Sequence, residues 1–217
     1  MSQADDRVVI GGAIQRLFDA AGLPWPPPAR RTVTPVPLDT LIQAYNLTHD
    51  EVPALSRAAA GAYLARWGVH RPELLEDAAP LAGFLFANAH GGYILVNAGD
   101  PLPRRRFTAA HELGHYLLHF LPRLQAARDV ETSLVLHDNG DTVREEDKEM
   151  SLPEMERQAN QFAAELLMPE TVCRTATHLY AARFRTPARF LEHHLAGDLL
   201  VSRDAMRWRL RNLNLTN

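Results

Sequence analysis

Cysteine is nearly absent from this chain, and its other deficits narrow the class of protein further. The one cysteine, Cys173, cannot form an internal disulfide and has no CxxC partner, so we expect a structural residue. The N-terminus has acidic residues where a secretory signal needs basic ones, and no apolar run is long enough to span a membrane. These deficits predict a cytoplasmic protein with no membrane partner.

The basic residues of the chain are not gathered into a large cluster either. The net charge is −3, and the basic residues are spread along the chain apart from one small cluster at residues 104–106. Because nucleic-acid binding requires a basic stripe or patch, we do not expect direct contact with DNA or RNA. A chain of 217 residues that is 46% hydrophobic can bury the core of one domain, with at most a small appendage.

The N-terminal third has helical patterns interrupted by proline. One pattern covers residues 14–21 and ends at Gly22, and the prolines of residues 24–37 predict an extended strap. Residues 38–67 are again helical in pattern, with Thr48 suited to cap a helix. A DNA-binding helix-turn-helix would fit this pattern, but the region is not basic, which favours a helical layer that covers the core.

Short β-type runs come next. "GFLFA" at residues 83–87 and "YILVN" at residues 93–97 flank "NAHGG", which predicts a hairpin whose exposed edge could hold an extended substrate. After the hairpin we expect a long apolar helix from Pro101 to Leu121 that ends at Pro122, and then a strand at residues 130–136. A capping box of Ser151 and Glu154 predicts the start of a further helix, which runs to Leu167. Residues 183–213 predict two or three more helices.

The long apolar helix contains the most unusual stretch, "FTAAHELGHYLLHF" at residues 107–120. Its polar side chains share an arc of about 100° on a helical wheel, and the other directions are apolar. The residues in that arc are Thr108, His111, Glu112, His115 and His119. Burying a polar group without a partner costs about 1–3 kcal/mol, so a bound metal explains this cluster better than core histidines do.

His111 and His115 form the HExxH pattern, in which two imidazoles on successive turns can share one zinc ion. Glu112, between them, can act as a general acid and base. Two histidines leave such an ion one protein ligand short. His119 lies about 12 Å along the helix from His111, too far to reach the same ion, so we expect it beside the ligands or in the core.

The third ligand is predicted on the helix that begins after Ser151. Its apolar residues share one face, and Glu156 and Asn160 interrupt the edge of that face, whereas Glu154 and Glu165 lie on the polar side. A carboxylate turned inward needs a cation, which makes Glu156 the candidate ligand, with a buried structural acid as the alternative. Asn160 can accept the second N–H of a ligating imidazole.

Two longer motifs carry a resemblance to a known family. "RRRFTAAHELGHYLLH" at residues 104–119 and "ERQANQFAAELLMPE" at residues 156–170, with "GGYILVNAGDPLPR" more loosely, resemble the ImmA/IrrE metallopeptidases. The resemblance implies an α+β fold with a zincin-like core, a small β-sheet plus the HExxH helix. The regions predicted are a helical and proline-rich covering region (1–80), the metallopeptidase core (81–170) and a helical region that is helix-turn-helix-like (171–217).

The resemblance also implies a site. His111, His115 and Glu156 would bind one Zn²⁺ per chain, or Mn²⁺ or another divalent ion, and Glu112 would be the catalytic acid and base. Tyr180 or His178 could donate a hydrogen bond to the oxyanion.

The activity implied is that of a zinc endopeptidase that cleaves a helix-turn-helix repressor in a stress or mobile-element response. The acidic run at residues 145–149 could gate access to the site. The alternative is a regulatory or toxin–antitoxin-like partner of a DNA-binding protein, with a structural metal site. Residues 195–213 favour it, since they predict a helix, a tight turn and an arginine-rich helix capped by Ser202.

Overall fold

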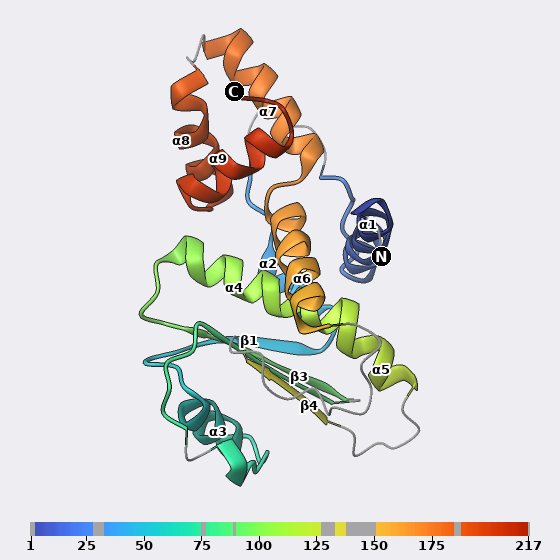
Figure 1. The fold of residues 1–217 in the computed structure, drawn as a ribbon, viewed down its shortest axis with the longest axis vertical. Helices are drawn as coiled ribbons and strands as arrows, with labels where there is room; N and C mark the ends of the chain where they lie inside the picture. Colours follow the sequence, from blue (N-terminus) through green and yellow to red (C-terminus); the bar gives the residue numbers. More distant parts are fainter. Residues whose placement is uncertain are drawn as a thin grey trace.

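The computed structural model describes residues 3–27, 33–74, 77–88, 90–126, 133–137, 151–184 and 188–216 (Figure 1). Its elements are α1 (Gln3–Ala20), α2 (Leu38–Gln43), β1 (Leu47–Val52), α3 (Arg57–Arg66), the 3₁₀ turn η1 (Pro72–Leu74), β2 (Gly83–Asn88), β3 (Gly91–Asn97), α4 (Leu102–His115), the π-helical segment η2 (Tyr116–Phe120), α5 (Leu121–Ala126), β4 (Ser133–His137), α6 (Leu152–Leu167), α7 (Glu170–Phe184), α8 (Ala188–Leu199) and α9 (Arg203–Asn212). This content confirms the predicted α+β class. Within the described ranges, no helix is long and apolar enough to cross a membrane.

A four-stranded sheet with the order β1-β3-β2-β4 forms the base of the fold. The predicted hairpin is present as β2 and β3, which pair antiparallel, while β1 adds parallel to β3 and β4 adds antiparallel to β2. Both hairpin strands are therefore internal. The expectation that the hairpin itself offers an exposed edge to a substrate is wrong, because β1 and β4 cover its two sides.

The two faces of the sheet pack against different helices. Alternate residues of β2 point to opposite sides: Leu85 joins the large core cluster with α1, α4 and α6, whereas Phe84 and Phe86 join the smaller cluster with α3. Figure 1 shows α4 along one face and α3 on the other. The HExxH helix is thus the helix that lies directly on the sheet.

Close packing of α6 on α4 depends on Gly114, inside the HExxH motif. A Cβ atom at Gly114 would lie 3.0 Å from Cδ1 of Phe162, which is fully buried in α6. Because this glycine has no side chain, the two helices can cross at short range, as seen in Figure 1. The crossing brings the first turns of α6 beside the histidines of α4.

Residues 47–52 are the clearest failure of the helical prediction for residues 38–67. They form β1, with Leu47 opposite Gly92 and Val52 opposite Asn97, and Thr48 lies inside the strand instead of capping a helix. Asn46, at φ 55°, turns the chain out of α2. Pairing with a distant strand overrides the local helical pattern, and the helix-turn-helix reading of this segment is wrong as well.

Two helices extend beyond their predicted ends. α1 begins at Gln3, eleven residues before the predicted start at residue 14. Its first half is helical as well because Asp6 and Ile10, like several residues of its second half, are buried against the rest of the fold. Gly22 follows it at φ +67°, as expected for a residue that ends a helix. The HExxH helix continues past Pro122 through the widened turn η2 into α5, which accommodates a ring that would clash within a regular α-helix.

Other predicted elements are present. The Ser151 and Glu154 capping box begins α6, and Met168 ends it. β4 (Ser133–His137) includes residues 133–136 of the predicted strand, whose first three residues lie outside the described residues. Cys173 is buried. α7 begins at Glu170, earlier than expected, while the acidic run at residues 145–149 and part of the proline strap lie outside the described residues.

A buried carboxylate fixes α1 to α6. Asp6 is fully buried, and its two oxygens accept hydrogen bonds of 2.6 Å from Arg157 and from Gln158. Burial alone would raise the pKa of Asp6, but these hydrogen bonds and the Arg157 charge together hold that pKa below its ordinary value. The stabilisation is therefore present above the unfolded pKa of about 3.9 and is lost as pH falls through the lower folded value.

We expect Asp6→Asn to lower the free energy of unfolding by about 1.5–3 kcal/mol at pH 7, the usual loss for hydrogen bonds to a charged group. The difference from wild type should narrow below about pH 4, where unfolded carboxylates become protonated. Urea unfolding between pH 3 and pH 7 measures both, with Asp19→Asn on the exposed side of α1 as the matched control. An equal deficit at pH 3 and pH 7 would contradict this electrostatic account.

Candidate metal centre

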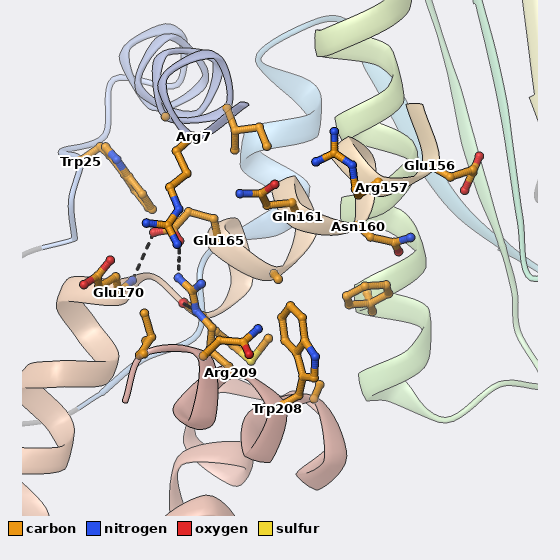
Figure 2. Close-up of a pocket in the computed structure, with 18 of the residues that line it drawn as sticks. Arg7, Trp25, Glu156, Arg157, Asn160, Gln161, Glu165, Glu170, Trp208 and Arg209 are labelled. Atoms are coloured by element: carbon orange, nitrogen blue, oxygen red, sulfur yellow. Dashed lines mark hydrogen bonds and ion pairs between the residues drawn. The ribbon is translucent and has the colours of Figure 1, made fainter. Parts of the chain in front are cut away.

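A hollow of about 1030 Å³ lies between α1, α6 and α9 (Figure 2). Glu156 and Asn160, on the first turns of α6, line one part of it. The same two residues face the histidines of α4. The candidate metal centre therefore lies where this hollow meets the HExxH helix.

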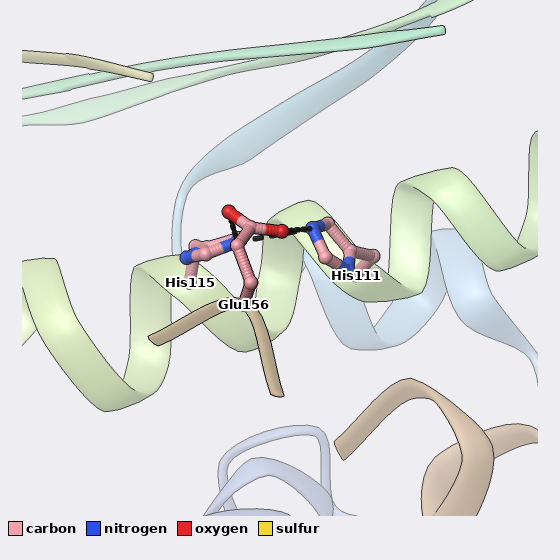
Figure 3. Close-up of side chains that lie close together, drawn as sticks. All are labelled: His111, His115 and Glu156. Carbon is pink, nitrogen blue, oxygen red and sulfur yellow. Dashed lines mark hydrogen bonds and ion pairs between the residues drawn. The ribbon is translucent and has the colours of Figure 1, made fainter. Parts of the chain in front are cut away.

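Three potential ligands converge there. Nε2 of His111 lies 3.3 Å from Oε2 of Glu156, Nε2 of His115 lies 3.1 Å from Oε1, and the two nitrogens are 3.0 Å apart. Figure 3 shows the carboxylate extending from α6 to both rings. A metal ion can be held where several histidine, cysteine or acidic side chains place their ligand atoms close together. In the described part of the chain, His111, His115 and Glu156 form such a group, with ligand atoms that all lie within 4.8 Å of one another.

These distances can be tested against a metal ion. Zinc bonds of about 2.0–2.2 Å in a tetrahedral arrangement separate neighbouring ligand atoms by about 3.3–3.6 Å. The 3.0 Å between the two nitrogens, and the 3.1 and 3.3 Å from each nitrogen to its nearer Glu156 oxygen, are close to that range. Two imidazole nitrogens and one carboxylate oxygen are a donor set that Zn²⁺ and other first-row ions accept, so these residues fit a divalent ion.

The Glu156 carboxyl is also in a protonation state that suits a metal ligand. Hydrogen bonds with His111 and His115 hold the pKa of the Glu156 carboxyl far below its ordinary value. Oδ1 of Asn160 lies 3.2 Å from Nδ1 of His111. When a metal ion replaces the Nε2 proton of His111, that amide oxygen can accept the Nδ1 proton and so hold the ring in the tautomer that binds the ion.

His119 forms a hydrogen bond with the backbone beside this group. Its Nε2 donates to the carbonyl oxygen of Met155 at 3.3 Å, and the ring lies 5.4 Å from that of His115, measured between centroids. Burial and the neighbouring His115 lower the pKa of His119 to about 4, so the ring is neutral at physiological pH. His119 thus holds the start of α6 in place, one residue before Glu156.

A comparison with protein families gives this geometry its context. The peptidase family M78, described as the IrrE N-terminal-like domain, matches residues 76–130 and 132–210, which is more than half of the chain. The chain belongs to this family. The match covers α4, α6, α7, α8 and most of α9. It confirms the resemblance found in the sequence and the zincin-like fold expected from it. No curated protein matches the chain significantly.

Glu112 of this family member is buried between α4 and the sheet, with 1% of its surface exposed. Gly83, at the start of β2, leaves the space: a Cβ atom there would lie 2.5 Å from Oε1 of Glu112 and 2.5 Å from Cγ2 of Thr108. The sequence analysis missed Gly83. The signal was that Gly83 shares a strand face with Leu85, which packs toward α4.

Tyr180 and His178, named as oxyanion donors from the sequence, both belong to α7. The Tyr180 hydroxyl donates to Asp198 of α8, and its ring stacks on His194 at 5.7 Å. Figure 1 shows α7 beyond the far end of α6 from the sheet. The structure does not bring either residue into the group of His111, His115 and Glu156.

Proposed function

We propose that this chain is a zinc-dependent endopeptidase. The observation that supports it most is the group of two imidazole nitrogens and one carboxylate, within 4.8 Å of one another, on the HExxH and following helices of a peptidase-family member. In this proposal His111, His115 and Glu156 hold the ion, and Glu112 is the catalytic acid and base.

The chemistry divides between the ion and the side chains. A zinc ion bound here would act as a Lewis acid that acidifies a water molecule and polarises a substrate carbonyl. Glu112 follows a ligand directly in sequence and is held against β2, so its carboxylate can take the proton of the attacking water. It then returns that proton to the departing amine. Asn160 keeps His111 in the tautomer that binds the ion.

For the substrate, we propose a helix-turn-helix repressor cut at one site. Membership of the IrrE-like family and the sequence resemblance support this choice. The test mixes zinc-loaded protein with the repressor encoded nearby and, separately, with casein, using Glu112→Gln as the matched variant. One discrete cut in the repressor, made only by wild type, is the expected result. General digestion of casein, or stable binding of the repressor without cleavage by either form, would overturn the proposal.

The alternative, a non-proteolytic partner of a DNA-binding protein, draws on α8 and α9. A short turn of three residues joins α8 to α9, and Ser202 caps α9 by accepting from the backbone N–H of Ala205. However, three of the four arginines of α9 bind carboxylates within the chain: Arg203 and Arg207 bind Glu192, and Arg209 binds Glu165. Arginines committed to internal ion pairs are poorly placed to bind phosphates, which favours the peptidase.

The space at Gly83 gives a prediction for this mechanism. Gly83→Ala should reduce repressor cleavage by about 100-fold, because the new methyl group must displace the Glu112 carboxylate or shift β2, and a misplacement near 1 Å costs about that much. Bound zinc should remain near one ion per chain, since Gly83 does not contact the three ligands. Cleavage rate and metal content measured on the same preparation test both statements.

Gly197→Ala on α8 is the control for that substitution, because a Cβ atom there meets nothing within 4 Å. It should cleave at the wild-type rate. A Gly83→Ala protein that also cleaves at that rate would show that the Glu112 position is not set by this contact.

A further inference from the structure

The hollow beside the metal centre has an excess of uncommitted positive charge. Most of the charged groups that line it are paired: Arg209 binds Glu165, Arg157 binds Asp6, and Glu170 binds Arg174 at 2.7 Å. Arg7 of α1 also lines the hollow and is exposed, yet it makes no ion pair or hydrogen bond with any part of the chain that the structure describes. A ligand in this hollow would therefore meet one cation that has no internal partner.

Apolar surface lies in the same hollow. Trp208 of α9 is 56% exposed, although Met206 and Leu210 on the same helix are fully buried. Figure 2 shows its indole ring facing the space between α9 and α6. Trp25 lines the hollow as well. A large exposed indole ring in a concave site offers contact area to an apolar side chain at little cost in conformational entropy.

The hollow borders the site of the proposed chemistry. Glu156 and Asn160 line it, and so does Phe107, whose ring centroid lies 6.5 Å from that of His111. A peptide that crosses the metal centre thus has the hollow beside one of its two ends. Pockets of this size, about 1030 Å³, are at the upper limit of small-molecule sites, and this one has room for several residues.

One wall of the hollow lies outside the part of the chain that the family model matches. The family match begins at residue 76, so α1 with Arg7, and Trp25 after it, lie before the matched region. The wall is firmly held, because Asp6, next to Arg7, binds Arg157 and Gln158 of α6. The position of the Arg7 backbone relative to Glu156 is therefore fixed through α6.

We propose that this hollow is the specificity groove of the peptidase, and that it selects a substrate segment in which an acidic residue contacts Arg7 and a large apolar residue contacts Trp208. The inference rests on the proposed peptidase function and adds the chemical class of its substrate sequence. The acidic and the apolar residue lie on the same side of the cleaved bond, because one groove holds both.

A library of capped random peptides tests the preference. We expect zinc-loaded wild type to cut peptides with an acidic and a large apolar residue on one side of the cleaved bond, identified by mass spectrometry. Arg7→Ala should reduce the preference for the acidic residue roughly fivefold, because that is the change in affinity that one exposed ion pair contributes. Arg7→Glu should reverse it toward basic residues, and Trp208→Ala should reduce the apolar preference roughly tenfold.

Matched controls come from α3, on the opposite face of the sheet. Arg66 and Trp67 are both exposed there, and Arg66→Ala and Trp67→Ala should leave the cleavage preferences unchanged. Cleavage by wild type without an acidic and apolar preference, or a preference that survives Arg7→Glu, would overturn the groove assignment.

A binding measurement separates this inference from the peptidase proposal. In the zinc-loaded Glu112→Gln, Trp67→Phe double variant, Trp25 and Trp208 are the remaining tryptophans, so fluorescence reports on the hollow. A capped hexapeptide with one aspartate and one phenylalanine should bind roughly fivefold more tightly than its lysine-substituted counterpart. If neither the library nor the repressor is cut but this discrimination is present, the groove is supported and the peptidase proposal fails. Equal binding of the two peptides would overturn the groove.

Discussion

Glu112→Gln should keep one metal ion per chain and lose hydrolysis by a factor of about 10² to 10⁴, the usual contribution of general acid–base catalysis. The amide has nearly the shape of the carboxylate, so it fits the space that Gly83 leaves and should preserve the packing of α4 on β2. It cannot take a proton from water. Glu112 is also absent from the group of His111, His115 and Glu156, so the metal should stay bound.

Two measurements on one preparation test this prediction. Elemental analysis gives the metal content, and the rate of repressor cleavage gives the activity. Glu154→Gln is the matched control, because Glu154 lies outside the metal group and a glutamine can also complete the capping box of α6. An active Glu112→Gln protein would remove Glu112 from the mechanism, and loss of metal from this variant would show that Glu112 helps to hold the ion.

Helical periodicity was enough to predict which side chains could meet at the metal centre. His111 and His115 face one way because four residues are only slightly more than one helical turn. Glu156 stands out because it interrupts the apolar face of α6. Both facts are local, since each depends on spacing within one helix. The contact between the two helices then follows from the burial of those faces, as the Gly114 and Phe162 packing shows.

Contacts between distant segments were not predictable in the same way. β1 is a strand because it pairs with residues 92–97, more than forty positions further along the chain. Its own sequence does not indicate which segment it pairs with. Gly83 has its role only because Thr108 and Glu112 lie over it. The groove wall formed by α1 depends on Asp6 binding α6, some 150 residues away.

The proposed metal ligation has the largest expected effect on binding. Glu156→Ala removes one of the three ligand atoms, so zinc affinity should fall by more than the 10- to 100-fold expected for loss of an outer partner. Asn160→Ala, which removes the hydrogen bond to His111, should fall within that range. His119→Ala should stay close to wild type, because His119 bonds the Met155 carbonyl and lies outside the ligand group.

Competition with a chelator of known affinity measures this order directly, without any assay of hydrolysis. Thermal unfolding gives a second readout, because an ion that binds only the folded state raises the melting temperature, and a more tightly bound ion raises it further. Zinc should therefore raise the melting temperature of wild type and of His119→Ala, but not that of Glu156→Ala. Full zinc occupancy in Glu156→Ala, together with loss of zinc in His119→Ala, would transfer the third ligand from α6 to the HExxH helix and overturn the proposed centre.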